Sequence, residues 1–148
     1  MQPLEQILEE ITAFENQLNR RSFIKATAFL LVVPSLTLGS DDRGFLERVA
    51  ATLIPSAALE TTGIKVADNV DHLLSRGSAD HRKKVLRFLA WSQRASIVYG
   101  GDKVAINARG SRFMLARKMG RTLSSLCLIA FWADERTLKL INTPEVVQ

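Results

Sequence analysis

The sequence predicts an all-α protein, a small irregular helical bundle preceded by an N-terminal export signal. Apolar residues recur three and four positions apart through most of the 148-residue chain, which is the period of an amphipathic helix. No stretch of four or more residues alternates apolar and polar side chains, as a half-buried strand would. Glycine and proline end several of the helical stretches.

The first 21 residues combine a helical pattern with a basic end. Apolar residues at helical spacing predict an amphipathic helix; they are Leu4, Ile7, Leu8, Ile11, Phe14 and Leu18. A paired arginine then opens a segment that resembles a twin-arginine export signal. Its recognition residues are Arg20, Arg21, Phe23, Ile24 and Lys25. The alternative interpretation is a basic turn before a buried core helix.

An uncharged stretch runs from Ala26 to Ser40. Its apolar part is shorter than the roughly 20 residues that span a bilayer, so we expect no stable membrane anchor. The nearest small-residue cleavage pattern is Thr37-Leu38-Gly39 before Ser40. We therefore assign residues 1–40 to a signal region with a long N-terminal part, outside the fold, and residues 41–148 to the helical domain.

The first half of that domain predicts two helices. Asp41 and Asp42 suit a helix N-terminus, where carboxylates meet free amide groups. This helix continues to Ile54 and ends at Pro55, because proline disfavours helical geometry in the residue before it. Residues 56–63 are predicted as a loop. A second short helix covers residues 68–74 and ends near Gly77.

The second half predicts three or more further helices. Ser78 and Asp80 open a helix that ends at Gly100-Gly101, since glycine tolerates a left-handed cap. Residues 103–107 are predicted as a short extended piece or loop. Residues 112–118 are predicted to be helical, with Gly120 as a weak point. Residues 121–132 form the most apolar helix and the expected core, and residues 134–141 form a last short helix.

The charge balance argues for a protein partner. The chain has 20 Lys and Arg against 15 Asp and Glu, a formal net charge of +5. These charges are scattered, and no recognition motif or stacking aromatic accompanies them, so we exclude nucleic-acid binding. We expect instead that a basic face of the protein binds an acidic partner protein.

The sequence shows no recognisable arrangement of catalytic, cofactor-binding or metal-binding residues. The single cysteine, Cys127, excludes an internal disulfide and cysteine metal clusters, and its apolar neighbours predict burial. His72 and His81 each follow an aspartate, which fits a metal or proton-relay pair; we interpret them instead as solvated histidines near helix ends. No glycine-rich phosphate loop or nucleophile elbow is present. We predict no catalytic, cofactor-binding or metal-binding residue.

Six side chains form the candidate partner interface: Arg82, Lys83, Lys84, Trp91, Phe131 and Trp132. Large aromatics anchor many interfaces, and a basic run steers acidic partners. The alternative interpretation places the aromatic residues in the core and the basic residues, with Arg87, on a solvated helix face.

Two motifs at the start of the domain carry a family resemblance. The first is Phe45-Leu46-x-x-Val49-Ala50-x-x-Leu53-Ile54-Pro55, and the second is Gly63-Ile64-x-Val66-Ala67-Asp68-x-Val70-Asp71. With the arginine pair, this order resembles the small-subunit family of gluconate 2-dehydrogenase, its subunit 3. The segment Leu128-Ile129-Ala130-Phe131-Trp132-Ala133-Asp134 is similar to the late helix-to-turn segment of that family.

The resemblance implies a noncatalytic, periplasmic accessory subunit. In such complexes FAD is bound by a catalytic subunit of the glucose–methanol–choline type, which has no signal of its own and crosses with the small subunit through the twin-arginine translocase. A multihaem cytochrome c often completes the complex at the inner membrane. The alternatives are an independent periplasmic helical module that binds an anionic ligand, and a small enzyme that uses His72 and His81.

Overall fold

A computed structural model describes residues 3–21 and 38–142. Every element in these two ranges is helical, which confirms the all-α prediction. The elements are α1 (Pro3–Arg21), α3 (Ser40–Leu53), α4 (Ser56–Thr62), α5 (Val66–Ser75), α6 (Ala79–Ser96), the 3-10 turn η1 (Gly101–Lys103), α7 (Val104–Arg109), α8 (Met114–Trp132) and α9 (Glu135–Asn142). None of the helices in the described ranges is both long and apolar enough to cross a membrane.

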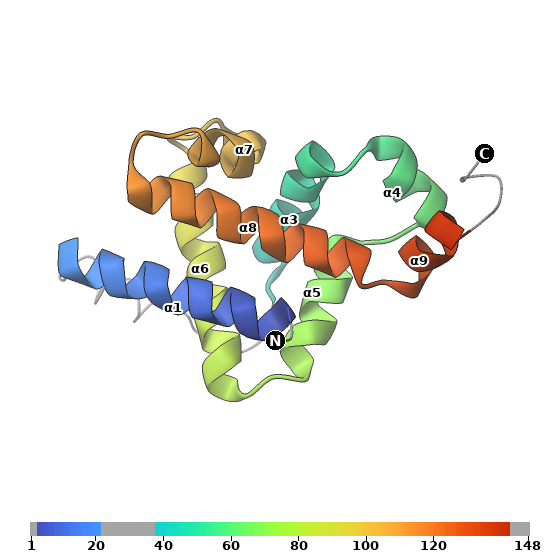
Figure 1. The fold of residues 1–148 in the computed structure, drawn as a ribbon, viewed down its shortest axis with the longest axis horizontal. Helices are drawn as coiled ribbons and strands as arrows, with labels where there is room; N and C mark the ends of the chain where they lie inside the picture. The colour runs from blue at the N-terminus through green and yellow to red at the C-terminus, as the bar shows by residue number, and fades with distance from the viewer. Residues whose placement is uncertain (1–2, 22–37, 143–148) are drawn as a thin grey trace.

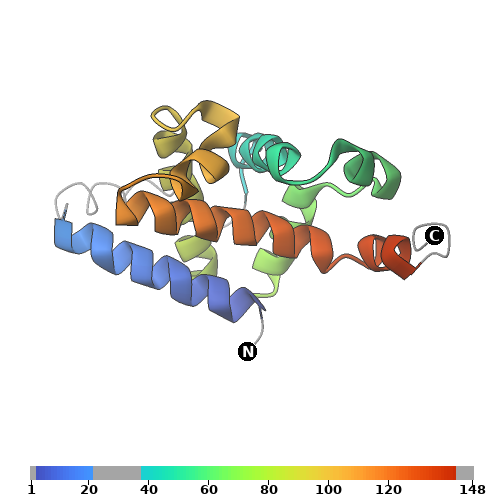
Figure 2. The ribbon, with the colours of Figure 1, turned by 45° about the horizontal axis from the view of Figure 1, so that its top comes forward.

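Helix α8 is the central element, and the other helices pack around it (Figure 1). Helix α1 lies beside α8 and runs in the opposite direction, as Figures 1 and 2 both show. Helices α3, α5 and α6 surround α8 on its other side, while α7 packs against its N-terminal half. The most apolar helix expected from the sequence is therefore the core of the fold.

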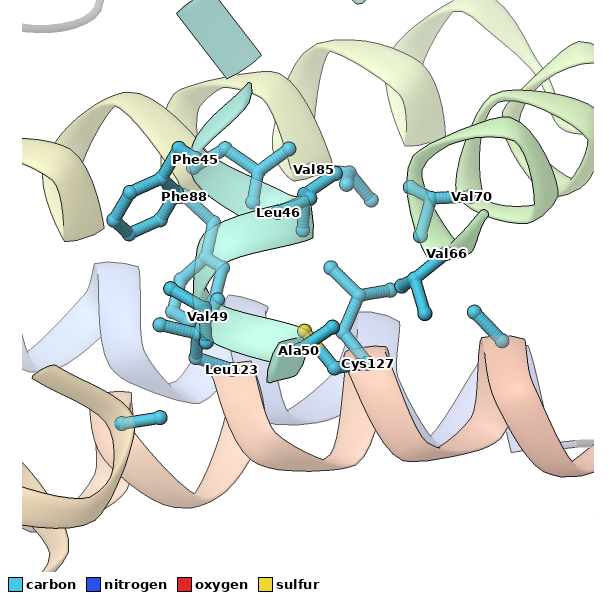
Figure 3. Packing of buried hydrophobic residues seen from close by; sticks show 14 of the residues in the cluster. Phe45, Leu46, Val49, Ala50, Val66, Val70, Val85, Phe88, Leu123 and Cys127 are labelled. Atoms are coloured by element: carbon cyan, nitrogen blue, oxygen red, sulfur yellow. The ribbon is translucent and has the colours of Figure 1, made fainter. Parts of the chain in front are cut away.

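The main core lies where α3 meets α5, α6 and α8 (Figure 3). Helix α3 contributes four buried apolar residues, which are Phe45, Leu46, Val49 and Ala50. They face Val66 and Val70 of α5, Val85 and Phe88 of α6, and Leu123 and Cys127 of α8. Full burial of a large apolar side chain contributes about 1.5–3 kcal/mol, so this cluster is a large part of the stability of the domain.

Helix α1 belongs to the same core, which corrects the division of the chain at residue 40. The helix itself was predicted, but its place in the fold was not. Ile7, Leu8, Ile11 and Phe14 are at most 7% exposed, and α1 packs on α8 and α6. An apolar helix face of this length needs a complementary surface, and these two helices supply it. Of the expected signal residues, Arg20 and Arg21 are described only as the end of α1, while Phe23, Ile24 and Lys25 lie outside the described residues.

Most of the predicted helix boundaries are confirmed. Helix α3 ends at Leu53, two residues before Pro55. Ser78 is the N-cap of α6, and its hydroxyl accepts a hydrogen bond from the backbone N–H of His81 at 3.2 Å. Helix α6 ends earlier than predicted, at Ser96 with Ile97 as its C-cap. Gly100 and Gly101 have left-handed φ values of 85° and 65°, but they lie at the start of η1.

Two predicted loops are wrong. Residues 56–62 form α4, which begins directly after Pro55; proline suits this position because an N–H there has no helical partner. Residues 104–109 form α7, which buries Val104, Ala105 and Ala108. Its β-branched residues lower helix propensity, and the packing of α7 against α8 overrides that preference.

Helix α8 passes through Gly120 without a break, so the predicted weak point is a packing contact. A Cβ atom on Gly120 would lie 2.7 Å from the backbone nitrogen of Arg109 and 2.8 Å from the carbonyl oxygen of Ala105. Both atoms belong to α7. Glycine therefore allows the backbones of α7 and α8 to approach each other closely.

Candidate partner interface

The basic run on α6 does not form one outward face. Lys84 Nζ donates to Thr12 Oγ1 of α1 at 2.9 Å. Arg87 donates to both carboxylate oxygens of Glu15, also on α1, at 3.3 and 3.2 Å. Lys83 is exposed. The run is thus divided, because α1 offers acidic and hydroxyl groups to the side of α6 that it covers, and Lys84 contacts α1.

Arg82 is only partly exposed, and its Nε is buried without a hydrogen-bond partner. A guanidinium nitrogen that donates to nothing is destabilising when it is removed from water. Arg82 therefore does not extend as a free cation from α6, although it begins the basic run in the sequence.

The three predicted interface aromatics have different environments. Trp91 is partly buried and packs against Phe14, with ring centroids 6.3 Å apart. Phe131 is 3% exposed and belongs to the core. Trp132 is 51% exposed and lies edge-on to Phe131 at 5.7 Å. Phe131 is therefore corrected to a core residue, and Trp132 is the aromatic of this set that offers most surface to a partner.

An apolar hollow was missed by the sequence analysis. It has a volume of about 260 Å³ and lies between α1, α6 and the start of α8, lined by Phe14, Trp91, Ala95, Tyr99, Phe113 and Met119. Phe113 and Met114 are 56% and 38% exposed, and Ile97 and Val98 in the adjoining turn are 86% and 78% exposed. One sequence feature could have indicated this hollow. It is the apolar pair Ile97-Val98, directly before Tyr99-Gly100, which continues the apolar sequence beyond the buried face of α6.

The two aspartates of the resemblance motif bind α3. Arg43 of α3 donates to Asp68 and to Asp71 of α5, each at 2.7 Å. Glu47, one turn further along α3, accepts from the backbone N–H of Ala67 at 2.9 Å and so satisfies a free amide in the first turn of α5. The motif therefore fixes α5 on α3. Neither Arg43 nor Glu47 was identified from the sequence.

A second polar junction joins α5, α8 and α9. Asn69 Nδ2 donates to the carbonyl oxygen of Ala130 at 2.8 Å and to Asp134 at 2.9 Å. The Arg136 guanidinium, hydrogen-bonded to Asp134, holds the pKa of that carboxyl group well below its usual range. Asp134 also accepts from the backbone N–H of Arg136, which stabilises the start of α9.

This junction lines a polar groove of about 550 Å³. The groove contains His72, Arg76, Asp134, Glu135 and Arg136. Cationic and anionic side chains are both present, and the charge of Arg136 is balanced by Asp134 at 3.0 Å. The positive and negative side chains that line the groove therefore balance, and their charges do not favour binding of an anion.

Cys127 is completely buried, as predicted. Burial raises the pKa of its thiol to about 12, and the charge of Glu47 adds to the shift. His72 and His81 are both exposed, on α5 and α6. Among the described residues, no group of three or more His, Cys, Asp or Glu side chains is arranged to hold a metal ion.

The chain was compared with protein-family models, with curated proteins and with solved structures, and no match was found. The resemblance to the small-subunit family therefore rests on the quoted motifs.

Proposed function

We propose that the chain is the noncatalytic small subunit of a FAD-dependent dehydrogenase of the glucose–methanol–choline type. In this role it carries the folded catalytic subunit through twin-arginine export and stabilises it in the periplasm. The observation that carries the proposal is the ordered segment from Arg20 to Lys25 with the uncharged stretch that follows it. The twin-arginine pathway exports folded proteins, so it suits a catalytic subunit that binds FAD before export.

The exposed apolar surface supports a role in a complex. Phe113 lines the apolar hollow, and Met114 next to it in the chain and Ile97 and Val98 in the turn after α6 are exposed as well. Monomeric soluble proteins rarely expose large contiguous apolar patches, and such patches commonly mark interaction sites. In the proposed complex the catalytic subunit covers this surface, and Trp132 and Lys83 offer further contacts at other points.

The test is co-expression of the chain with the flavoprotein encoded beside it, with Arg20→Lys and Arg21→Lys introduced together. We expect the flavoprotein to remain in the cytoplasm, because the paired guanidinium groups are the recognition feature of the signal. FAD-dependent activity and immunodetection in the periplasmic fraction measure the result. Arg121→Lys, at an exposed position on α8, is the matched control and should leave export unchanged. Undiminished export of the flavoprotein by the double variant would contradict the escort role.

A further inference from the structure

The surface that α1 covers has the chemistry of a helix-binding groove. We define the α6/α8 groove as the apolar floor of Phe88, Trp91 and Met119 with the polar rim of Lys84, Arg87 and Thr122. Phe14 inserts over this floor, with its ring 5.6 Å from Phe88 in an edge-to-face arrangement. Two cationic side chains on α6 and one hydroxyl group on α8 border it. Such a groove fits an amphipathic helix with carboxylates beside its apolar face.

Helix α1 shows which positions an occupant must fill. Its apolar anchors have the spacing i, i+1, i+4 and i+7, at Ile7, Leu8, Ile11 and Phe14. Its carboxylates meet the rim: Glu15 binds Arg87 with both side chains less than one fifth exposed, and Glu10 accepts from Thr122 Oγ1 at 3.2 Å. Because the Glu15–Arg87 pair is poorly solvated, its loss leaves an unpaired charge and is costly.

Helix α1 forms an outer layer of the domain. The side-chain oxygen Gln17 Oε1 is buried and has no hydrogen-bond partner among the described residues. The outer face of α1 is solvent-exposed, at Glu5, Gln6, Glu9, Ala13 and Asn16. The helix is joined to the domain only through the segment that follows Arg21. It can therefore leave without breaking the contacts between α3, α5 and α8.

We propose that the α6/α8 groove is the docking site for an acidic amphipathic helix of the escorted flavin subunit, and that α1 fills the groove until that helix arrives. The choice of partner rests on the proposed function. When α1 is displaced, a helix with carboxylates at the positions of Glu10 and Glu15 restores the contacts to Thr122 and Arg87.

The first experiment tests the groove without any export step. A fluorescein-labelled peptide with the sequence of residues 3–21 is titrated into full-length chains, and its anisotropy is measured. In a Glu15→Arg chain the resident α1 is repelled by Arg87, so we expect the peptide to bind about ten-fold more tightly than to the unaltered chain. Adding Arg87→Glu to that chain should remove the gain, whereas adding Lys83→Glu, at an exposed site on α6, should preserve it.

Three results would overturn the groove as a docking site. The first is that a Glu15→Arg chain with a helical circular dichroism spectrum does not bind the peptide saturably. The second is that Arg87→Glu does not change peptide binding. The third is that two copies of the chain form a stable dimer by exchanging α1. If the Glu15→Arg chain does not fold, Phe14→Ala provides the same weakening of the resident helix and takes its place.

The second experiment tests the partner. Excess 3–21 peptide is added to the purified complex with the flavoprotein, which is then separated by size exclusion. We expect the peptide to release the flavoprotein, and a peptide with Glu10 and Glu15 replaced by glutamine to release less. A complex that is unaffected by the peptide would overturn the assignment of the groove to the flavin subunit. Undiminished export of the flavoprotein by the Arg20→Lys, Arg21→Lys chain would instead contradict only the escort role, so the two failures are distinguishable.

Discussion

Helices α1 and α3 both pack against α8, but different contacts hold them there. Helix α3 is surrounded by α5, α6 and α8, and Arg43 and Glu47 tie it to the start of α5. Helix α1 covers α8 and α6 from outside, through one apolar face and a few charged contacts. The comparison suggests an interior built around α3 and α8 and an outer helix, α1, which we predict can be lost while the interior persists.

The largest expected difference comes from truncating a buried anchor in each helix. Leu46→Ala in α3 should lower the free energy of unfolding by about 2–5 kcal/mol within a single cooperative transition. Phe14→Ala in α1 should instead detach that helix, so helical signal is lost before the main unfolding transition. Denaturant titration followed by circular dichroism measures both. A single transition of equal cooperativity in the two variants would contradict the division.

Gly120→Ala tests the contact between α7 and α8 inside the stable part. The added methyl group would lie less than 3 Å from two backbone atoms of α7, and forced overpacking of this kind costs about 1–3 kcal/mol. Gly110→Ala is the matched control, because its Cβ would lie 3.6 Å from the nearest neighbouring atom, the carbonyl oxygen of Asn107, at an ordinary backbone conformation. Equal melting temperatures for the two variants would show that α7 is not tightly packed.

Cys127 gives a smaller, pH-dependent effect in the interior. Its folded pKa of about 12 lies above its ordinary value of 9.0, so the folded state keeps the thiol proton while the unfolded state loses it. The thiol therefore contributes stability that is fully present below pH 9 and is lost as the pH rises toward 12. By linkage, the loss reaches about 1 kcal/mol near pH 10.

Chemical denaturation of the native chain and of Cys127→Ala between about pH 8 and pH 10.5 isolates this contribution, because all other titrating groups are shared. The native chain should lose stability more steeply than the variant. Parallel curves would show that the thiol is hydrated in the folded state.

Much of the fold could be predicted because periodicity reports burial directly. The apolar spacing in α3, α6 and α8, the N-cap at Ser78 and the left-handed backbone at Gly100 are local properties, and each is confirmed. The place of α1 in the core was missed because its residues were assigned to the export signal and therefore placed outside the fold. The same periodicity that predicted the helix also required a surface to cover, and that requirement is the physical reason for its place in the core.

The candidate site was less predictable than the fold. Asp68 and Asp71 lie 25 and 28 residues after Arg43, and the three meet only because α3 and α5 pack together. Likewise, Lys84 was expected at a partner interface and Arg87 on a solvated helix face or beside that partner. Helix α1, 72 residues earlier in the chain, supplies their hydrogen-bond acceptors instead. Such pairings depend on tertiary contacts that a single sequence does not specify.

Native-state hydrogen exchange of the full chain tests the separable α1 most directly. Exchange at each amide reports the free energy of the smallest opening that exposes it. We predict that the amides of α1 exchange through a local opening well below the free energy of global unfolding, whereas those of α3 and α8 exchange only with the global transition. Exchange of α1 at the same free energy as α3 and α8 would show that the chain is one indivisible unit, and would contradict the account.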